Sequence, residues 1–149
     1  MKGRGSNSNI QGRFESLTRD TFDDGWDQSS DDPRKPLNTE VTEERVKSIL
    51  STNQSPDIPF RYSINPYRGC EHGCSYCFAR PTHSFIDLSP GLDFESKLFA
   101  KINAAECLKR EISKKRYVCS PISIGASTDP YQPIEKKYEI TRSLIRVLS

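Results

Sequence analysis

Three cysteines lie within eight positions of one another, and this spacing limits the possible folds of the 149-residue chain more than any other feature. They are Cys70, Cys74 and Cys77, separated by three and then two residues. Gly69 and Gly73 interleave with them, and glycine lets a backbone turn tightly where a side chain would collide. One loop can therefore bring all three thiols to a single centre.

Clustered thiols bind metals, and two kinds of centre are compatible with the spacing. A four-iron cubane is usually held by four Cys, so a loop that offers three leaves one iron open to a small molecule. The alternative is a structural zinc site of the Cys3His kind, completed by His72 or His83. Zinc modules usually show two separated ligand pairs, and a second pair is missing here. The spacing therefore favours an iron-sulfur cluster.

The two remaining cysteines, Cys107 and Cys119, are isolated in the sequence. Free Cys behaves as a small buried hydrophobe, so we predict that both pack in the core. Five Cys are few for a disulfide-stabilised chain of this length, and no signal peptide is recognisable, which favours a cytoplasmic location.

The first third of the chain differs in composition from the rest. Hydrophobic residues make up only 34% of the chain, and the deficit falls in residues 1–54, where residues 20–32 carry six Asp and no Lys or Arg. Such sequence buries too little apolar surface to offset its ordering entropy, which predicts a disordered or loosely attached leader over residues 1–54. Within it, residues 39–50 have apolar positions at partly helical spacing, compatible with a short helix. Scattered aromatic and leucine side chains could also dock on the body: Phe14, Leu17, Phe22 and Trp26.

Residues 55–149 alternate between strand and helix patterns. Strands are predicted at 60–65, 97–102 and 121–126, the last as a buried parallel strand. A helix is predicted from Asn103, as N-cap with Glu106 three residues on, to the cations near 114–116, and another over 140–148. This order indicates an α/β fold with a parallel sheet.

Two polar loops follow predicted strands, one holding the cysteines and one over residues 125–133. The carboxyl ends of parallel strands carry the active site in such folds, so we expect both loops to meet at that edge. Residues 1–54 carry 8 basic and 10 acidic groups, and residues 55–149 carry 14 and 10. The resulting charges of −2 and +4 do not by themselves require a nucleic-acid partner, and nothing in the sequence suggests a membrane partner.

Several motifs together resemble a known family. They are SPDIPF from Ser55, NPYRGCEHGC from Asn65, CFARPTH from Cys77, SPGLDFE from Ser89 and GASTDPYQPIE from Gly125. In this order they resemble the radical S-adenosylmethionine (radical SAM) proteins related to spore photoproduct lyase, often labelled DNA repair photolyases. The resemblance covers residues 55–149 and makes zinc mimicry a poor explanation.

The resemblance implies an enzyme that uses a 4Fe-4S cluster to cleave S-adenosyl-L-methionine reductively and generate a 5'-deoxyadenosyl radical. It implies a partial (β/α) barrel with the cluster in the loop after the first strand. An external electron donor of flavodoxin or ferredoxin type is implied, and a DNA lesion is one candidate substrate.

Carried over by position, Cys70, Cys74 and Cys77 are the expected cluster ligands, and Tyr76 is expected beside the adenine of SAM. Gly125, Ala126 and Ser127 are expected near the methionine amino group, although Gly-Gly-Glu is common at this place elsewhere in the radical SAM superfamily. Other polar residues fit the motifs without a role: Arg68, His72, Arg80, His83, Asp129, Tyr131 and Gln132.

A partial barrel needs more chain than residues 55–149 provide, since a full barrel takes about 250 residues. The sequence thus predicts an incomplete radical SAM core, the N-terminal portion of a longer protein, with weak activity or none on its own. The alternatives from other classes are an iron-sulfur electron-transfer protein and a zinc-binding module without catalysis.

Overall fold

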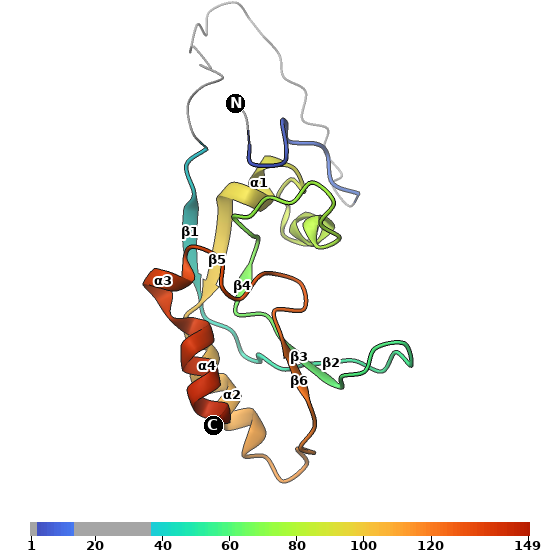
Figure 1. Ribbon diagram of the computed structural model, residues 1–149, viewed down its shortest axis with the longest axis vertical. Coiled ribbons are helices and arrows are strands. Elements are labelled where there is room, and N and C mark those ends of the chain that lie inside the picture. Colours follow the sequence, from blue (N-terminus) through green and yellow to red (C-terminus); the bar gives the residue numbers. More distant parts are fainter. Residues whose placement is uncertain (1–2, 14–36) are drawn as a thin grey trace, which may run out of the picture.

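The computed structural model describes residues 3–13 and 37–149, and it has a mixed α/β architecture with two small sheets (Figure 1). In chain order its elements are β1 (Glu40–Glu44), β2 (Ser51–Thr52), β3 (Tyr62–Ile64), β4 (Tyr67–Arg68), the 3-10 helix η1 (Arg80–Ile86), α1 (Leu92–Ser96), β5 (Lys97–Lys101), α2 (Ala104–Ile112), β6 (Ile122–Ile124), α3 (Glu135–Tyr138) and α4 (Ile140–Leu148). The predicted α/β class is therefore confirmed.

The strands form two three-stranded sheets of mixed direction. One has the order β1-β5-β4 and the other β2-β3-β6. β1 runs parallel to β5 and β3 parallel to β6, whereas β4 and β2 pair antiparallel with their neighbours. The prediction of a parallel sheet thus holds for the pair β3 and β6, which follows the pattern of strand, crossover and strand, but not for either sheet as a whole.

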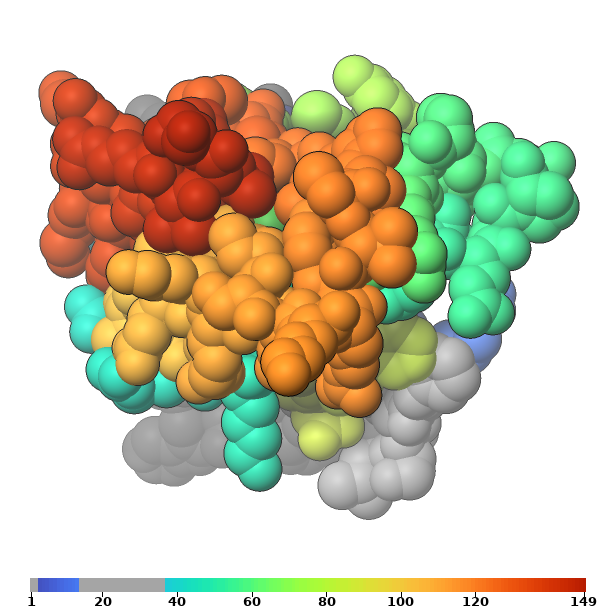
Figure 2. All heavy atoms as spheres, turned by 90° about the horizontal axis from the view of Figure 1, so that it is seen from below, coloured from blue at the N-terminus to red at the C-terminus, as the bar shows by residue number. Residues whose placement is uncertain are grey.

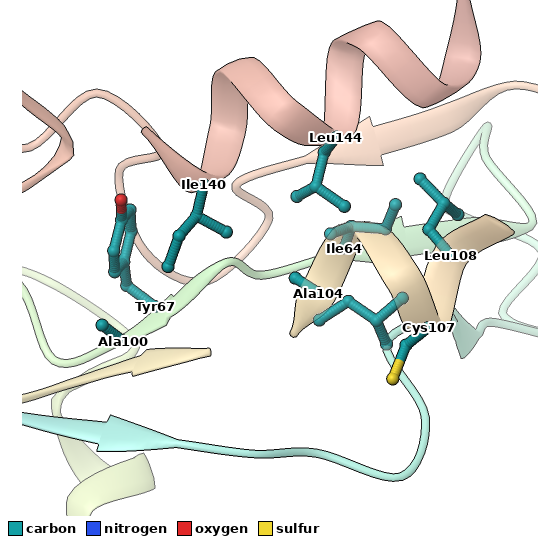
Figure 3. Close-up of a cluster of buried hydrophobic side chains, with 9 residues drawn as sticks. Ile64, Tyr67, Ala100, Ala104, Cys107, Leu108, Ile140 and Leu144 are labelled. Atoms are coloured by element: carbon teal, nitrogen blue, oxygen red, sulfur yellow. The ribbon is translucent and has the colours of Figure 1, made fainter. Parts of the chain in front are cut away.

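Helices α2 and α4 pack together and close the core against β3. Figure 3 shows Leu144 of α4 pointing toward Ile64 of β3 and Leu108 of α2, with Ile140 of α4 beside Tyr67. Ile64, Leu108 and Leu144 are fully buried, and burying a side chain of this size contributes about 1.5–3 kcal/mol. Seen from below, α2, α4 and the segment leading into β6 cover one face of the molecule (Figure 2).

The predicted boundary at residue 54 is wrong for the described part of the leader. Residues 40–44 form a strand rather than the suggested helix, and Glu40 to Glu44 pair with Lys97 to Lys101 of β5. Ile49 is 4% exposed within the main core. Backbone pairing with β5 supplies hydrogen bonds that apolar content does not reveal. Phe14, Leu17, Phe22, Trp26 and the acidic run at 20–32 lie outside the described residues.

Other predicted elements agree closely with the structure, with local differences. The strand at 97–102, the helix after Asn103 and the helix at 140–148 are observed as β5, α2 and α4. Asn103 does not cap α2 with its side chain. β6 is half-buried rather than buried, and Cys119 is exposed rather than packed, although Cys107 is buried as predicted. Within the described ranges, no helix has the length and apolar character needed to cross a membrane.

Candidate functional site

The two polar loops meet at one edge of the second sheet, as the sequence predicts. Ile64 at the end of β3 pairs with Ile124 at the end of β6 in parallel register. The pairing continues into the loops, because the Gly125 amide donates to the Ile64 carbonyl at 2.8 Å. The Ser127 amide donates to Asn65 Oδ1, also at 2.8 Å. The cysteine loop and the 125–133 loop therefore leave the sheet side by side.

A cavity of about 550 Å³ opens between these loops. Its lining consists of Cys70, His72, Cys74, Cys77, Phe78, Gly125, Ala126, Ser127, Thr128 and Asp129. Six of the seven predicted site residues thus line one space. The seventh, Tyr76, lies outside this lining with 88% of its surface exposed, so the structure does not join it to the others.

The three thiols differ in exposure. Cys70 is buried, Cys74 and Cys77 are partly exposed, and none of them is in a disulfide. Burial raises the pKa of the Cys70 thiol above its ordinary value. In the described part of the chain, no three His, Cys, Asp or Glu side chains are grouped as a formed metal site. The donor set suits a cluster held by three Cys, whereas the arrangement seen is a shared cavity rather than a closed ligand shell.

Glycine is required at two positions of the cysteine loop. Gly69 has a φ of 78° and Gly73 a φ of 62°, both in the left-handed region that glycine alone adopts without strain. A Cβ at Gly69 would lie 2.7 Å from Leu98 Cδ2 and 2.9 Å from His83 Cε1. The tight folding expected from the interleaved glycines is confirmed.

Arg80 holds the cysteine loop through hydrogen bonds to its backbone carbonyls, a role that the sequence did not assign. Its guanidinium donates to the Cys74 carbonyl at 2.9 Å and the Gly73 carbonyl at 2.7 Å. It also donates to the carbonyls of Pro90 and Gly91 at 3.2 and 3.1 Å and to the Glu95 carboxylate at 2.5 Å. The Cys-Phe-Ala-Arg motif marked this residue, but its acceptors could be found only in three dimensions.

Gln132 joins the two loops to each other. Its side chain is fully buried; Oε1 accepts from the Glu71 amide at 3.1 Å, and Nε2 donates to the Gly69 carbonyl at 3.2 Å. Thr128 adds a hydrogen bond from its hydroxyl to the Tyr67 carbonyl at 3.2 Å. These contacts hold the 125–133 loop over the cysteines and so define the cavity.

The two histidines near the cysteines lie in different surroundings. His72 lines the cavity, and its Nε2 is 3.2 Å from Asp129 Oδ2. His83 is fully buried with Nε2 at 2.9 Å from the Lys97 carbonyl and its ring edge-on to Phe94. His83 therefore does not line the cavity that the three cysteines share.

Comparisons with known proteins give relatives but no named activity. No family model matches the chain, and no solved structure matches it. Uncharacterized proteins of Mycobacterium tuberculosis and Mycobacterium bovis are each 38% identical to it over 119 residues, which is 78% of this chain and 35% of theirs. An uncharacterized protein of Methanocaldococcus jannaschii is 26% identical over 110 residues, which is 74% of this chain and 39% of that protein. The chain thus spans little more than a third of the length of these relatives.

Proposed function

We propose that this chain forms the cofactor-binding part of a radical SAM enzyme, with β3 and β6 as the first strands of a partial (β/α) barrel. One observation carries the proposal. The three clustered cysteines and residues 125–127 come from loops 55 residues apart, counted from Cys70 to Gly125, and they line the same cavity at the carboxyl edge of a parallel strand pair.

Different residues of the chain would bind the cluster and leave room for SAM. Cys70, Cys74 and Cys77 would hold a 4Fe-4S cluster through their thiolates. Gly125 and Ala126 add no bulk to the facing wall, which leaves room for SAM beside the cluster. When bound and reduced, such a cluster supplies the electron that cleaves SAM.

The supporting side chains would keep this site in shape. Arg80 and Gln132 hold the backbone carbonyls of the cysteine loop, so the thiols need not be ordered by the cofactor alone. Preformed geometry matters because a small misplacement of reacting groups costs rate steeply. Both residues are positioning residues in this proposal.

The proposal includes an electron donor of flavodoxin or ferredoxin type and a reducing cytoplasm, where thiols stay free. A nucleic-acid lesion is one candidate substrate. Residues 55–149 carry only a modest basic excess, 14 basic against 10 acidic groups. Substrate contacts of the whole enzyme would then fall largely in the part of the relatives that this chain does not span.

Anaerobic reconstitution with iron and sulfide tests the proposal. We expect a brown protein with about four irons per chain, and single changes of Cys70, Cys74 or Cys77 to Ala should abolish this. Cys107→Ala and Cys119→Ala are the matched controls and should keep the iron. The reduced protein should then convert SAM to methionine and 5'-deoxyadenosine, slowly if the rest of the barrel is needed.

The two competing functions, a zinc-binding module and an iron-sulfur electron-transfer protein, would give different results in the same experiment. Stoichiometric zinc without iron, in protein purified without oxygen, would indicate the zinc-binding module, with His72 as its nearest candidate fourth ligand. A full cluster that neither binds nor cleaves SAM would indicate electron transfer.

A further inference from the structure

The N-terminal segment 3–5 contacts the cysteine loop, and its residues are not part of the cavity lining. In Figure 1 this segment lies beside α1 and the cysteine loop, although 65 positions separate Gly5 from Cys70 in the sequence. The contact is close, because a Cβ placed on Gly5 would overlap the Gly73 carbonyl oxygen. A Cβ on Gly73 would in turn lie 2.6 Å from Arg4 Cβ.

A fully buried carboxylate, Glu95, is the anchor of this contact. Its Oε2 accepts from the Arg4 amide at 2.6 Å and the Gly5 amide at 3.1 Å. Its Oε1 accepts from the Arg80 guanidinium at 2.5 Å. A buried charge is stable only when it is paired and hydrogen-bonded, so the N-terminal segment and Arg80 satisfy Glu95 together.

The Arg4 side chain extends the same network to the cysteine loop itself. Its guanidinium donates to the Glu95 carbonyl at 2.6 Å, to Thr39 Oγ1 at 2.9 Å and to Glu71 Oε1 at 3.4 Å. Glu71 directly follows Cys70, whose own amide donates to the Phe94 carbonyl at 3.0 Å. The planar guanidinium reaches three acceptors at once, which an ammonium group on a flexible stem does less well.

We propose that Arg4 and Gly5 are positioning residues of the cofactor site: through Glu95 they fix Arg80, and Arg80 fixes the carbonyls of Gly73 and Cys74. Residues 3–5 are thereby a structural part of a site whose thiols lie far along the chain. The inference rests on the proposed function for what the thiols bind, but the positioning itself is a property of the protein without cofactor.

Thiol reactivity in the reduced, cofactor-free full chain tests the positioning directly. Cys70 is 8% exposed and should react with iodoacetamide slowly, through local opening of its loop, whereas exposed Cys119 is an internal reference. Arg4→Ala should speed alkylation of Cys70 by about tenfold and leave Cys119 unchanged, because only the local opening is altered. Arg4→Lys should rescue little of this protection.

The matched control is Arg45→Ala, which removes an arginine whose side chain forms an exposed ion pair with Glu106 of α2. It should leave the Cys70 rate unchanged. A second variant, Gly5→Ala, reaches the same loop by steric displacement and should also speed Cys70. Unchanged Cys70 rates in both Arg4→Ala and Gly5→Ala, or equal acceleration of all five thiols, would overturn the positioning role.

Iron retention then separates this inference from the proposed function. In reconstituted protein, Arg4→Ala should lose iron to a chelator several-fold faster than Arg45→Ala. If the unaltered chain takes up no iron while Arg4→Ala still exposes Cys70, the cofactor proposal fails and the positioning stands. If the unaltered chain binds a cluster and Arg4→Ala alters neither Cys70 nor iron loss, the positioning fails alone.

Discussion

His72 and His83 are the only two histidines of the chain, and burial makes them chemically different. His83 has no exposed surface, and its Nδ1 has no hydrogen-bond partner among the described residues. Burial lowers the pKa of His83 below its ordinary value, since a buried imidazolium would lose its hydration. His72 is nearly half exposed and faces Asp129 across the cavity mouth. His83 is therefore the residue on which the effect of burial can be measured.

The lowered pKa of His83 predicts that the stability of the protein depends on pH. The unfolded chain binds the proton first, near the ordinary His pKa of 6.5, so stability is full above that pH and falls as the pH drops through it. One such group gives a slope of up to about 1.4 kcal/mol per pH unit. His83→Gln should flatten the dependence of the urea-unfolding free energy on pH between neutral and mildly acidic conditions. A pH slope that is the same in His83→Gln and in the unaltered chain would exclude His83 as the cause.

Single residues show where the sequence was informative and where it was not. The spacing of Cys70, Cys74 and Cys77 predicted one shared site because close neighbours in a loop stay close in space. Arg80 and Gln132 were recognised as parts of motifs but received no role, because most of their partners are backbone groups. Backbone acceptors leave no trace in sequence, so such roles require the fold.

At the scale of elements, local patterns predicted local structure and failed where pairing is distant. Helices α2 and α4 follow their apolar periodicity. Strand β1 was missed because its partner β5 lies 57 positions further along the chain, and its polar sequence shows little of the strand pattern. The same distance hid the true role of Asn103. Its side chain donates to the Val46 carbonyl at 2.9 Å and accepts from the Val46 amide at 2.8 Å, which ties α2 to the segment after β1.

This tie predicts different effects for the two residues of the apparent capping box. Asn103→Ala leaves the Val46 amide without its acceptor and the Val46 carbonyl with only the Cys107 thiol as donor, and it should lower the free energy of unfolding by about 1–3 kcal/mol. Glu106→Ala removes only an exposed side chain, 69% of which is accessible, and should have almost no effect. Urea unfolding of both variants at neutral pH measures the difference. A larger loss in Glu106→Ala would mean that the residue acts as a helix cap after all.

At the scale of the whole molecule, the site is assembled from three separate stretches of chain. The segment 3–5 and the 125–133 loop both contact the cysteine loop. Buried Glu95 binds the segment 3–5, and buried Gln132 joins the 125–133 loop to the cysteine loop. The sequence correctly placed the two loops at one edge of a sheet, since parallel strands fix that direction. It placed the start of the folded body too late, because composition measures apolar burial and not backbone pairing.

Two truncated chains test whether the folded body begins at residue 55, as composition predicts, or before β1, as the structure shows. A chain that begins at Asn38 keeps β1 and loses the donors of Arg4 and Gly5 to Glu95, so it should unfold cooperatively with a free energy lower by about 1–3 kcal/mol. A chain that begins at Ser55 also loses the parallel partner of β5 over five residues and the buried side chain of Ile49.

The shorter chain should therefore lack a cooperative transition, because the edge of β5 is left unpaired and the main core loses Ile49. Circular dichroism during urea titration, together with limited proteolysis, compares the two chains at equal concentration. A Ser55 chain that unfolds at the same midpoint as the full chain would restore the boundary that composition predicts, and β1 would then contribute nothing to the stability of the fold.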